Sequence, residues 1–192
     1  MNVNYYHSRA SVNEYISLSK DVSGRELIEK FNLILPKKST VLELGSGPGT
    51  DWKILSENHT VIGSDNSKEF LRHLNRQCPK GKFIELDAVS LNTQLKFDGI
   101  YSNKVLHHLT DHDLLQSAKK QSELLKGGGI ICHSFWKGVG SEIFKGLFVN
   151  YHTKEDLEKV FNPYFDNLSI EPYAEFDTDD SLLLLGRNKS KE

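Results

Sequence analysis

A chain of 192 residues has the size of one domain and is long enough to bury a substantial apolar core. Its 24 lysine and arginine residues nearly cancel its 26 acidic residues, so the composition gives no electrostatic reason to bind nucleic acid or an anionic membrane surface. Because the two cysteines lie far apart and no apolar run has the length of a signal-peptide core or a membrane span, we expect a single domain over residues 1–192, reduced, cytoplasmic and without a membrane partner.

Strand-like and helix-like patterns alternate from residue 24 to residue 135. The first helix, residues 24–31, is expected to begin with a capping box made by Ser23 and Glu26. The expected strands that follow are residues 39–44, 60–65, 82–87, 97–103 and 129–135, and the expected helices between them are residues 51–58, 68–77 and 111–125. Strands separated by such helices predict a parallel sheet with helices on both faces.

The C-terminal third of the chain has a different pattern. A predicted helix over residues 151–161, with Thr153 as its cap, precedes two strand-like runs, 167–176 and 181–187, which a short acidic turn joins. Two strands joined in this way form an antiparallel hairpin. The predicted fold class is therefore α/β: a Rossmann-like, doubly wound and mainly parallel sheet with an antiparallel C-terminal edge strand and helices on both faces.

The stretch VLELGSGPGTD, residues 41–51, runs from an apolar strand into three glycines at alternate positions. Ligands bind at the carboxyl ends of strands in such sheets, so the turn is expected to hold one, although glycines can also serve a tight turn alone. The triphosphate pattern GxxxxGK[ST] is absent, and the dinucleotide pattern GxGxxG would need glycine where Thr50 stands. Acids around the turn disfavour a pyrophosphate and favour a cation. These acids are Glu43, Asp51, Asp65 and Asp87.

S-adenosylmethionine has the required chemistry, because its sulfonium and ammonium groups are positive and its ribose offers a diol to an acid. Five stretches in order now give the chain a resemblance to the class I S-adenosylmethionine-dependent methyltransferases of the small-molecule type, over nearly its whole length. They are ELGSGPG, VIGSDNS, FIELDAVSL, FDGIYSNKVLHHLTD and LKGGGIICHSFW. The resemblance implies S-adenosylmethionine as cofactor and a seven-stranded sheet whose last strand is antiparallel.

The resemblance also implies which positions hold the cofactor. Those expected at its methionine part are Glu43, which supports the loop, the backbone of Gly45, Ser46 and Gly47, and a backbone carbonyl at Ser102 or Asn103. Those expected at its ribose and adenine are Asp65, Asn66, Asp87 and the amide of Ala88. Each acid also has a plainer interpretation, since Glu43 can brace the loop without touching ligand and Asp65 can cap the next helix.

The methyl acceptor is less well defined by the sequence. The Asn/Asp-Pro-Pro-aromatic pattern of enzymes that methylate base or amide nitrogens is missing from SNKVLHH, and the chain has no basic face, so a small-molecule acceptor is favoured over nucleic acid. Its pocket is expected between the N-terminal segment and the chain after the fifth strand. The residues expected to contact the acceptor are Tyr6 and Tyr15 in the first and Trp136, Tyr151 and His152 in the second.

His107 and His108 follow the fourth strand and are candidate catalytic residues, although helix entry or packing explains such a pair equally well. No histidine spacing resembles a metal site. Residues 1–22 are rich in tyrosine and polar groups but poor in aliphatic ones, and are interpreted as a lid over the cofactor rather than a frayed terminus. Two alternatives stay open: an NAD(P)-dependent oxidoreductase, and a non-catalytic S-adenosylmethionine-binding protein.

Overall fold

The structure is a computed structural model that describes residues 5–20 and 22–189. Residues 1–4 of the expected lid, residue 21 and the side chain of Tyr5 lie outside the described part. The helical elements are η1 (Tyr5–His7), α1 (Arg9–Leu18), α2 (Arg25–Ile34), α3 (Thr50–Leu55), α4 (Lys68–Gln77), η2 (Leu106–His108), α5 (Asp111–Leu124) and α6 (Lys154–Phe161). The strands are β1 (Thr40–Leu44), β2 (Thr60–Asp65), β3 (Lys82–Glu85), β4 (Phe97–Asn103), β5 (Leu125–Trp136), β6 (Ser141–Phe144), β7 (Leu147–Asn150), β8 (Phe165–Tyr173) and β9 (Ser181–Asn188).

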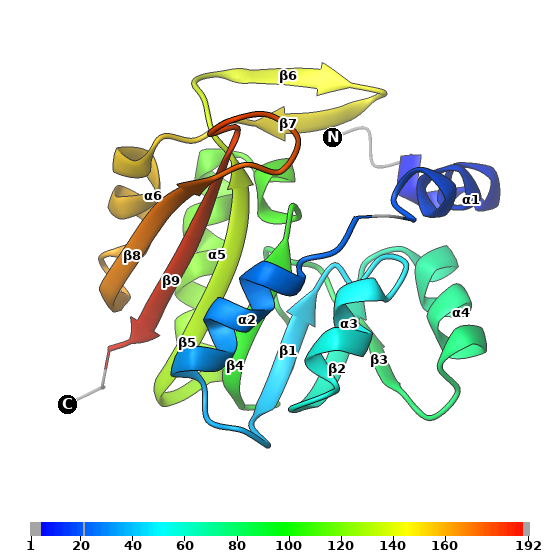
Figure 1. Ribbon diagram of the computed structural model, residues 1–192, viewed down its shortest axis with the longest axis horizontal. Coiled ribbons are helices and arrows are strands. Elements are labelled where there is room, and N and C mark those ends of the chain that lie inside the picture. The colour runs from blue at the N-terminus through cyan, green and yellow to red at the C-terminus, as the bar shows by residue number, and fades with distance from the viewer. Residues whose placement is uncertain (1–4, 21, 190–192) are drawn as a thin grey trace.

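Seven strands form one twisted sheet in the order β3-β2-β1-β4-β5-β9-β8 (Figure 1). β1 to β5 pair in parallel, and β9 pairs antiparallel with both β5 and β8. This confirms the predicted seven-stranded, mainly parallel sheet with an antiparallel last strand. In detail, β9 lies one place in from the edge, and β8 is the edge strand.

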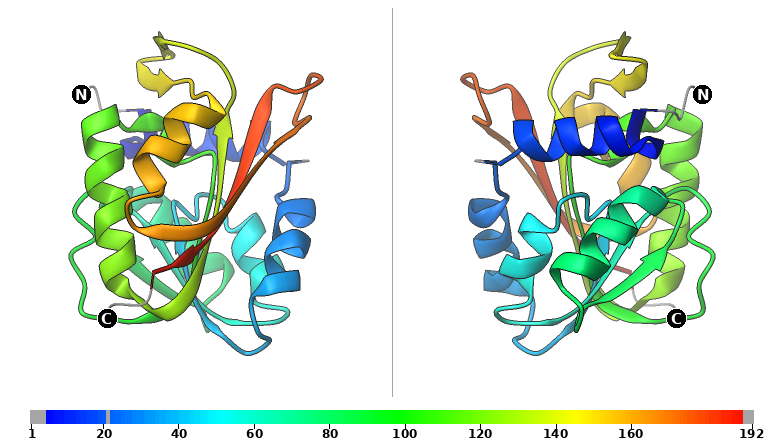
Figure 2. Two further views of the ribbon diagram at one scale, coloured as in Figure 1. Left: turned by 90° about the vertical axis from the view of Figure 1, so that its left-hand side faces the viewer. Right: turned by 90° about the vertical axis from the view of Figure 1, so that its right-hand side faces the viewer.

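Alternating side chains of the central strands supply two separate cores, one on each face of the sheet. Leu42 of β1 belongs to the cluster that packs against α5 and α6, whereas its neighbour Val41 belongs to the cluster that packs against α2 and α3. Figure 2 shows α5 and α6 on one side of the sheet and α2 and α3 on the other. The sheet is therefore doubly wound, as predicted.

The local signals at helix starts were only partly correct. Thr153 caps α6 through a full capping box with Asp156, as expected. The box predicted for Ser23 does not form: α2 begins at Arg25, its N-cap is Gly24, and no side chain caps it in the way expected. The amide of Gly24 instead donates to Asp51 Oδ1 at 2.7 Å. An acid from α3 therefore supplies the acceptor at this helix start.

Two helical and hairpin regions were not predicted. The N-terminal segment forms η1 and α1, and α1 is capped by Ser8, whose hydroxyl accepts from Ser11 N. After β5 the chain forms the β6–β7 hairpin, whose turn residues Lys145 and Gly146 have φ values of 49° and 80°. Both regions lie beyond the carboxyl ends of the parallel strands (Figure 1). In the described part of the chain, no helix combines the length and apolar character needed to cross a membrane.

Candidate active site

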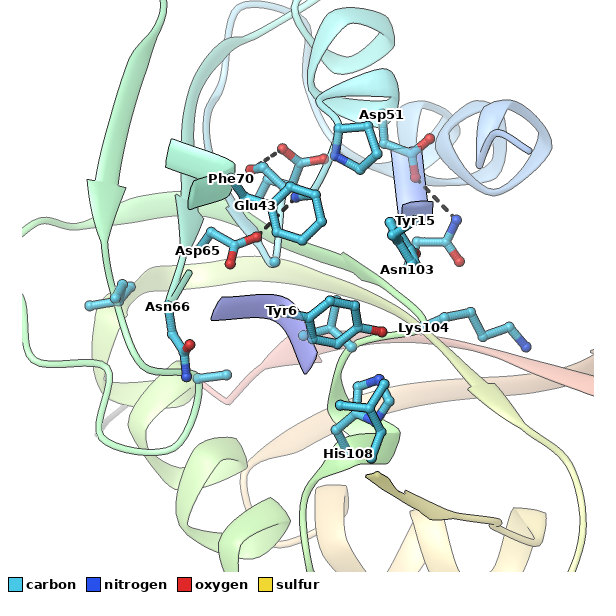
Figure 3. A pocket seen from close by; sticks show the side chains of 18 of the residues that line it. Tyr6, Tyr15, Glu43, Asp51, Asp65, Asn66, Phe70, Asn103, Lys104 and His108 are labelled. Carbon is cyan, nitrogen blue, oxygen red and sulfur yellow. Dashed lines mark hydrogen bonds between the residues drawn. The ribbon is translucent and has the colours of Figure 1, made fainter. Parts of the chain in front are cut away.

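A cavity of about 390 Å³ lies at the carboxyl ends of β1, β2 and β4, which is where a ligand was expected. The turn after β1 and the loop after β3 form its floor. Residues of η1, α1, η2 and β7 complete the walls (Figure 3). The volume is within the range of about 300–1,000 Å³ that is usual for small-molecule sites.

The glycine turn has a backbone that only glycine adopts easily. Gly45, Gly47 and Gly49 have φ values of 65°, 48° and 86°, in the left-handed region. A Cβ atom on Gly45 would lie 2.5 Å from Val105 Cγ2, whereas one on Gly47 would meet nothing closer than 4.0 Å. Gly45 is therefore required for packing, and Gly47 leaves open space on the cavity side of the turn.

Glu43 lies beneath this turn and is only 2% exposed. The hydroxyl of Ser46 donates to its Oε2 at 2.5 Å. Burial raises the pKa of Glu43 to about 8, and the nearby charges of Asp51 and Asp65 act in the same direction, against the lowering effect of Ser46. Glu43 is thus neutral at pH 7 in the ligand-free protein. One member of the ring of four acids expected from the sequence is therefore uncharged under these conditions.

Asp65 ends β2 and lines the cavity with Asn66. Its two carboxylate oxygens accept from backbone amides, Oδ2 from Gly47 at 3.0 Å and Oδ1 from Ser67 at 2.8 Å. Burial raises the pKa of Asp65, and the backbone hydrogen bonds oppose this effect. Asp65 therefore links the glycine turn to the start of α4, and both its predicted ligand contact and its alternative structural role are compatible with this position.

Asp87 and Ala88 line the cavity after β3. Asp87 Oδ1 accepts from the amides of Val89 and Ser90, at 3.1 and 2.8 Å, and from the Ser90 hydroxyl at 3.0 Å. The Asp87 side chain thus closes its own turn through one oxygen. Oδ2 forms no hydrogen bond with the described residues, so it stays available to a ligand.

Asp51 joins three elements at the side of the cavity. Its carboxylate accepts from Gly24 N at 2.7 Å, from the Tyr101 hydroxyl at 2.8 Å and from Asn103 Nδ2 at 3.1 Å. Tyr101 is fully buried, so its hydroxyl depends on this partner. The sequence predicted Asp51 only as one of the acids around the turn. The structure assigns it a second role, which is to hold α2, α3 and β4 together.

The two alternative ammonium-binding positions are separated by the structure. Asn103 lines the cavity, whereas Ser102 is fully buried and is not among the lining residues. The hydroxyl of Ser102 is 2.8 Å from His133 Nδ1, on the core side of β4. Because the expected contact is made by a backbone carbonyl, the choice between Ser102 and Asn103 as the ammonium-binding position stays a prediction.

Of the residues expected to contact the acceptor, Tyr6 and Tyr15 line the cavity. Their rings pack edge-on with centroids 5.4 Å apart, and each also packs against Phe70. The hydroxyl of Ser67 donates to the carbonyl of Tyr6, which ties η1 to the start of α4. The N-terminal segment therefore covers the cavity in this structure, and its opening and closing remain a prediction.

Trp136, Tyr151 and His152 are not among the lining residues, so the structure does not bring them to the cavity as expected. Trp136 packs on Lys104, whose Nζ lies 3.5 Å from the ring centroid. The hydroxyl of Tyr151 donates to Glu142, and His152 is buried behind β5 with 2% exposure. The residues after β5 that do line the cavity are instead Leu147 and Phe148 of β7, in the β6–β7 hairpin, and Asn150, Tyr151 and His152 follow them without reaching it.

Of the two candidate catalytic histidines, only His108 lines the cavity. His107 is buried, and its Nδ1 has no hydrogen-bond partner among the described residues. His108 lines the cavity, and its Nδ1 lies 2.7 Å from the carbonyl oxygen of Phe148, so this nitrogen must carry the proton. Burial lowers the pKa of both rings. At neutral pH, His108 therefore presents an unprotonated Nε2. The described residues contain no cluster of histidine, cysteine or acidic side chains suited to a metal.

Several lining residues were not found from the sequence. They are His7, Ser19, Val22, Pro48, Thr50, Phe70, Leu86, Val89, Lys104, Val105, Leu109, Asp113, Leu147 and Phe148. For Leu147 and Phe148 a usable signal exists: a Lys-Gly pair stands between two apolar runs, which is the pattern of a short hairpin turn. The others come from elements whose packing, rather than sequence pattern, brings them to the cavity.

A family model described as a methyltransferase domain matches residues 41–129. A trans-aconitate 2-methyltransferase of Rhodopseudomonas palustris is 31% identical over 111 residues, which cover 56% of this chain and 42% of that protein. An uncharacterized methyltransferase of Bacillus cytotoxicus is 33% identical over 119 residues, which cover 58% of this chain and 56% of that protein. The chain thus spans about half the length of the curated relatives it matches.

Solved structures agree on the fold. A 1,6-didemethyltoxoflavin-N1-methyltransferase of Burkholderia thailandensis, with 1,6-didemethyltoxoflavin and S-adenosylhomocysteine bound, has a TM-score of 0.75 at 19% identity, covering 94% of this chain and 85% of that one. CalS10, an amino pentose methyltransferase of Micromonospora echinaspora with S-adenosylmethionine bound, has a TM-score of 0.72 at 14% identity, covering 92% and 97%. Residues 41–129 are therefore similar to a methyltransferase domain, and the seven-stranded sheet of the chain is the fold of these solved methyltransferase structures.

Proposed function

We propose that this protein is an enzyme that binds S-adenosylmethionine and transfers its methyl group to a small-molecule acceptor. One observation carries the proposal over a dinucleotide-binding function: the glycine turn is flanked by Glu43 and Asp51, and Asp65 already accepts from the amide of Gly47 in the turn itself. Lys104 is the only lysine or arginine among the described lining residues. A pyrophosphate would meet acids here without a counter-charge, whereas a sulfonium or ammonium group would be stabilised.

The described residues fit the cofactor part by part. Gly47 leaves space beside the turn for the methionine part, and Asp65 has a carboxylate at the cavity for the ribose hydroxyls. At the adenine end, Asp87 keeps Oδ2 available, and Ala88 lines the cavity next to it. Asn103 is the position at the ammonium end. When bound, the cofactor supplies an electrophilic methyl group.

His108 is the residue that we assign to proton transfer. The carbonyl of Phe148 fixes the proton on Nδ1, so Nε2 is the atom that can accept a proton from an acceptor hydroxyl or amine. The rings of His108 and Tyr6 are 5.9 Å apart, which places Nε2 near the covered end of the cavity. Buried His107 has a packing role in this assignment.

The size and enclosure of the cavity support a small acceptor. The N-terminal segment covers it, and a macromolecular substrate would need a docking face beside it, which the scattered basic residues do not provide. The matched proteins include small-molecule methyltransferases by name. The chain covers less than half of its trans-aconitate relatives, so their acceptor is not carried over.

Calorimetric titration with S-adenosylmethionine, S-adenosylhomocysteine and NAD in parallel tests the cofactor. We expect the first two to bind and NAD to fail. Asp65→Asn should weaken binding by roughly 1–3 kcal/mol through lost charge-assisted hydrogen bonds, whereas Asp166→Asn, on the exposed edge strand β8, should not. NAD binding with no response to the other two would overturn the proposal.

Methyl-transfer activity separates an enzyme from a non-catalytic binding protein. S-adenosylmethionine bearing a labelled methyl group should lose the label to an acceptor fraction of small molecules. Retention of the label on the cofactor in the presence of every small-molecule fraction would favour the non-catalytic alternative.

A further inference from the structure

The charge of the cavity lining restricts the methyl acceptor, on the basis of the proposed function. The acids that line the cavity are Glu43, Asp51, Asp65, Asp87 and Asp113. The only basic residues among the described lining residues are His7, Lys104 and His108. An acceptor that carries carboxylates would need at least one of these three to act as its counter-charge.

Lys104 cannot act in this way because its side chain is directed elsewhere. Its backbone has a φ of 52°, and its Nζ lies 2.6 Å from Ser181 Oγ and 3.0 Å from the carbonyl oxygen of Phe135. The same atom sits 3.5 Å from the centroid of the Trp136 ring. Figure 3 shows the lysine extending away from Tyr6 and Asp65. The ammonium is therefore already bound on the far side of the cavity wall.

The two histidines offer no better counter-charge. His7 lies close enough to Asp65 to lower the pKa of that carboxyl, so its ring already interacts with an acid of the protein. The proton of His108 Nδ1 is donated to Phe148, and burial lowers the pKa of the ring, which keeps it neutral at pH 7. Every basic group among the described lining residues thus either already interacts with other groups of the protein or is uncharged.

The covered end of the cavity is instead apolar and aromatic. The side chains there come from η1, α1, η2 and the β6–β7 hairpin and include Tyr6, Tyr15, Leu109, Leu147 and Phe148. Tyr6 and Tyr15 present ring edges and faces at a right angle to each other. Such surfaces pack well against a planar ring, but they offer no ion pair that would compensate the desolvation of a carboxylate.

We propose that the methyl acceptor is an uncharged aromatic molecule and that the cavity rejects acceptors that carry a carboxylate. Burying a carboxylate at the apolar end of the cavity is costly, because no free cation among the described lining residues there repays its desolvation. An uncharged ring avoids this cost and gains contact with the aromatic wall.

Matched pairs of ligands test the proposal with the full chain and saturating S-adenosylhomocysteine, so that no turnover is required. The pairs are para-hydroxybenzoate with its methyl ester and an indole carboxylate with its methyl ester, and trans-aconitate serves as a tricarboxylate probe. Calorimetry at pH 7 should show each ester binding about tenfold more tightly than its acid, or better, a factor that corresponds to 1.4 kcal/mol. Trans-aconitate should not bind.

A charge introduced at the apolar end provides the second arm. Leu147→Lys should reduce the ratio of the dissociation constants of each acid and its ester by about tenfold, because the new ammonium pairs with the carboxylate of the acid. Leu147→Met, of similar length and uncharged, is the matched control and should keep the wild-type ratio. Any variant is compared only after its S-adenosylhomocysteine affinity and thermal unfolding match those of wild type.

The outcomes separate this proposal from the proposed function. Failure of S-adenosylhomocysteine to bind would overturn the cofactor assignment itself. With that cofactor bound, equal or tighter binding of the acids, binding of trans-aconitate, or no binding of either ester would overturn the uncharged aromatic acceptor and leave the methyltransferase assignment intact. If Leu147→Lys left the ratio of ester to acid affinity unchanged, the charge of the lining would not determine which acceptor binds.

Discussion

The close approach of Gly24 to the side wall of the cavity predicts that Gly24→Ala destabilises the protein. A Cβ at this position would lie 2.1 Å from the Tyr101 hydroxyl, 2.6 Å from Asp51 Oδ2 and 3.0 Å from Asn103 Nδ2. None of these contacts is acceptable, and the fully buried ring of Tyr101 has no space into which to retreat. The methyl group must therefore displace the carboxylate that joins α2, α3 and β4.

The size of the effect follows from two contributions. Overpacking of a dense site costs about 1–3 kcal/mol. Lengthening the bonds from Asp51 to Tyr101 and to Gly24 N, now 2.8 and 2.7 Å, costs about 0.5–1.5 kcal/mol each. We therefore expect Gly24→Ala to lower the free energy of unfolding by about 2–6 kcal/mol. The backbone itself contributes nothing, since Gly24 has a φ of −82°.

Urea unfolding followed by circular dichroism at pH 7 measures this effect. Gly127→Ala is the matched control, because a Cβ there meets no atom within 4 Å, and it should change stability by less than about 0.5 kcal/mol. Tyr101→Phe removes the nearest clashing atom, so Gly24→Ala should cost at least about 1 kcal/mol less in that background. A Gly24→Ala protein as stable as the control, or strict additivity with Tyr101→Phe, would refute the reasoning.

Three further predictions concern the cavity. The folded-state pKa of Glu43 is about 8, above its ordinary value of 4.5, so between these two pH values the folded protein holds one proton more than the unfolded chain. As the pH rises through this window, the free energy of unfolding should fall by up to about 1.4 kcal/mol per pH unit. Glu43→Gln should remove this component, and a wild-type-to-variant difference that is constant with pH would contradict it. Nitrogen-15 NMR at pH 7 should show His108 neutral with its proton on Nδ1; a proton on Nε2 would exclude it as proton acceptor. Trypsin should cleave at Arg9 more slowly when S-adenosylhomocysteine is bound, and faster in Ser67→Ala, which loses the bond to Tyr6; equal rates throughout would mean that the segment is not a lid.

The arrangement of the sheet could be predicted from the sequence because each strand has its own apolar run and each helix its own period. The same regularity placed Asp65 and Asn66 at a strand end and hence at the cavity. Their roles in binding remain predictions. The antiparallel position of β9 also followed from the short acidic turn before it.

What the sequence could not provide depends on contacts between distant segments. The proton of Glu43 is retained because tertiary packing buries the carboxyl, which no local pattern reveals. Trp136 was expected at the cavity, but it is not among the lining residues, and its ring packs on Lys104 through a contact that no local pattern reveals. Ser23 has the right neighbours for a capping box, yet the acceptor at the start of α2 comes from Asp51, 27 positions from Gly24.

Because β9 pairs with both β5 and β8, the stability of β8 in the sheet depends on the pairing of β9 with β5. β8 has β9 as its only strand neighbour in the described part of the sheet, so loss of the β5–β9 pairing would detach both strands together. The amides of Leu183 and Ile170 should therefore share one opening event in hydrogen exchange, although one lies inside the sheet and the other at its edge. That opening would uncover Cys132, the buried thiol of β5, to oxidants that the closed sheet excludes.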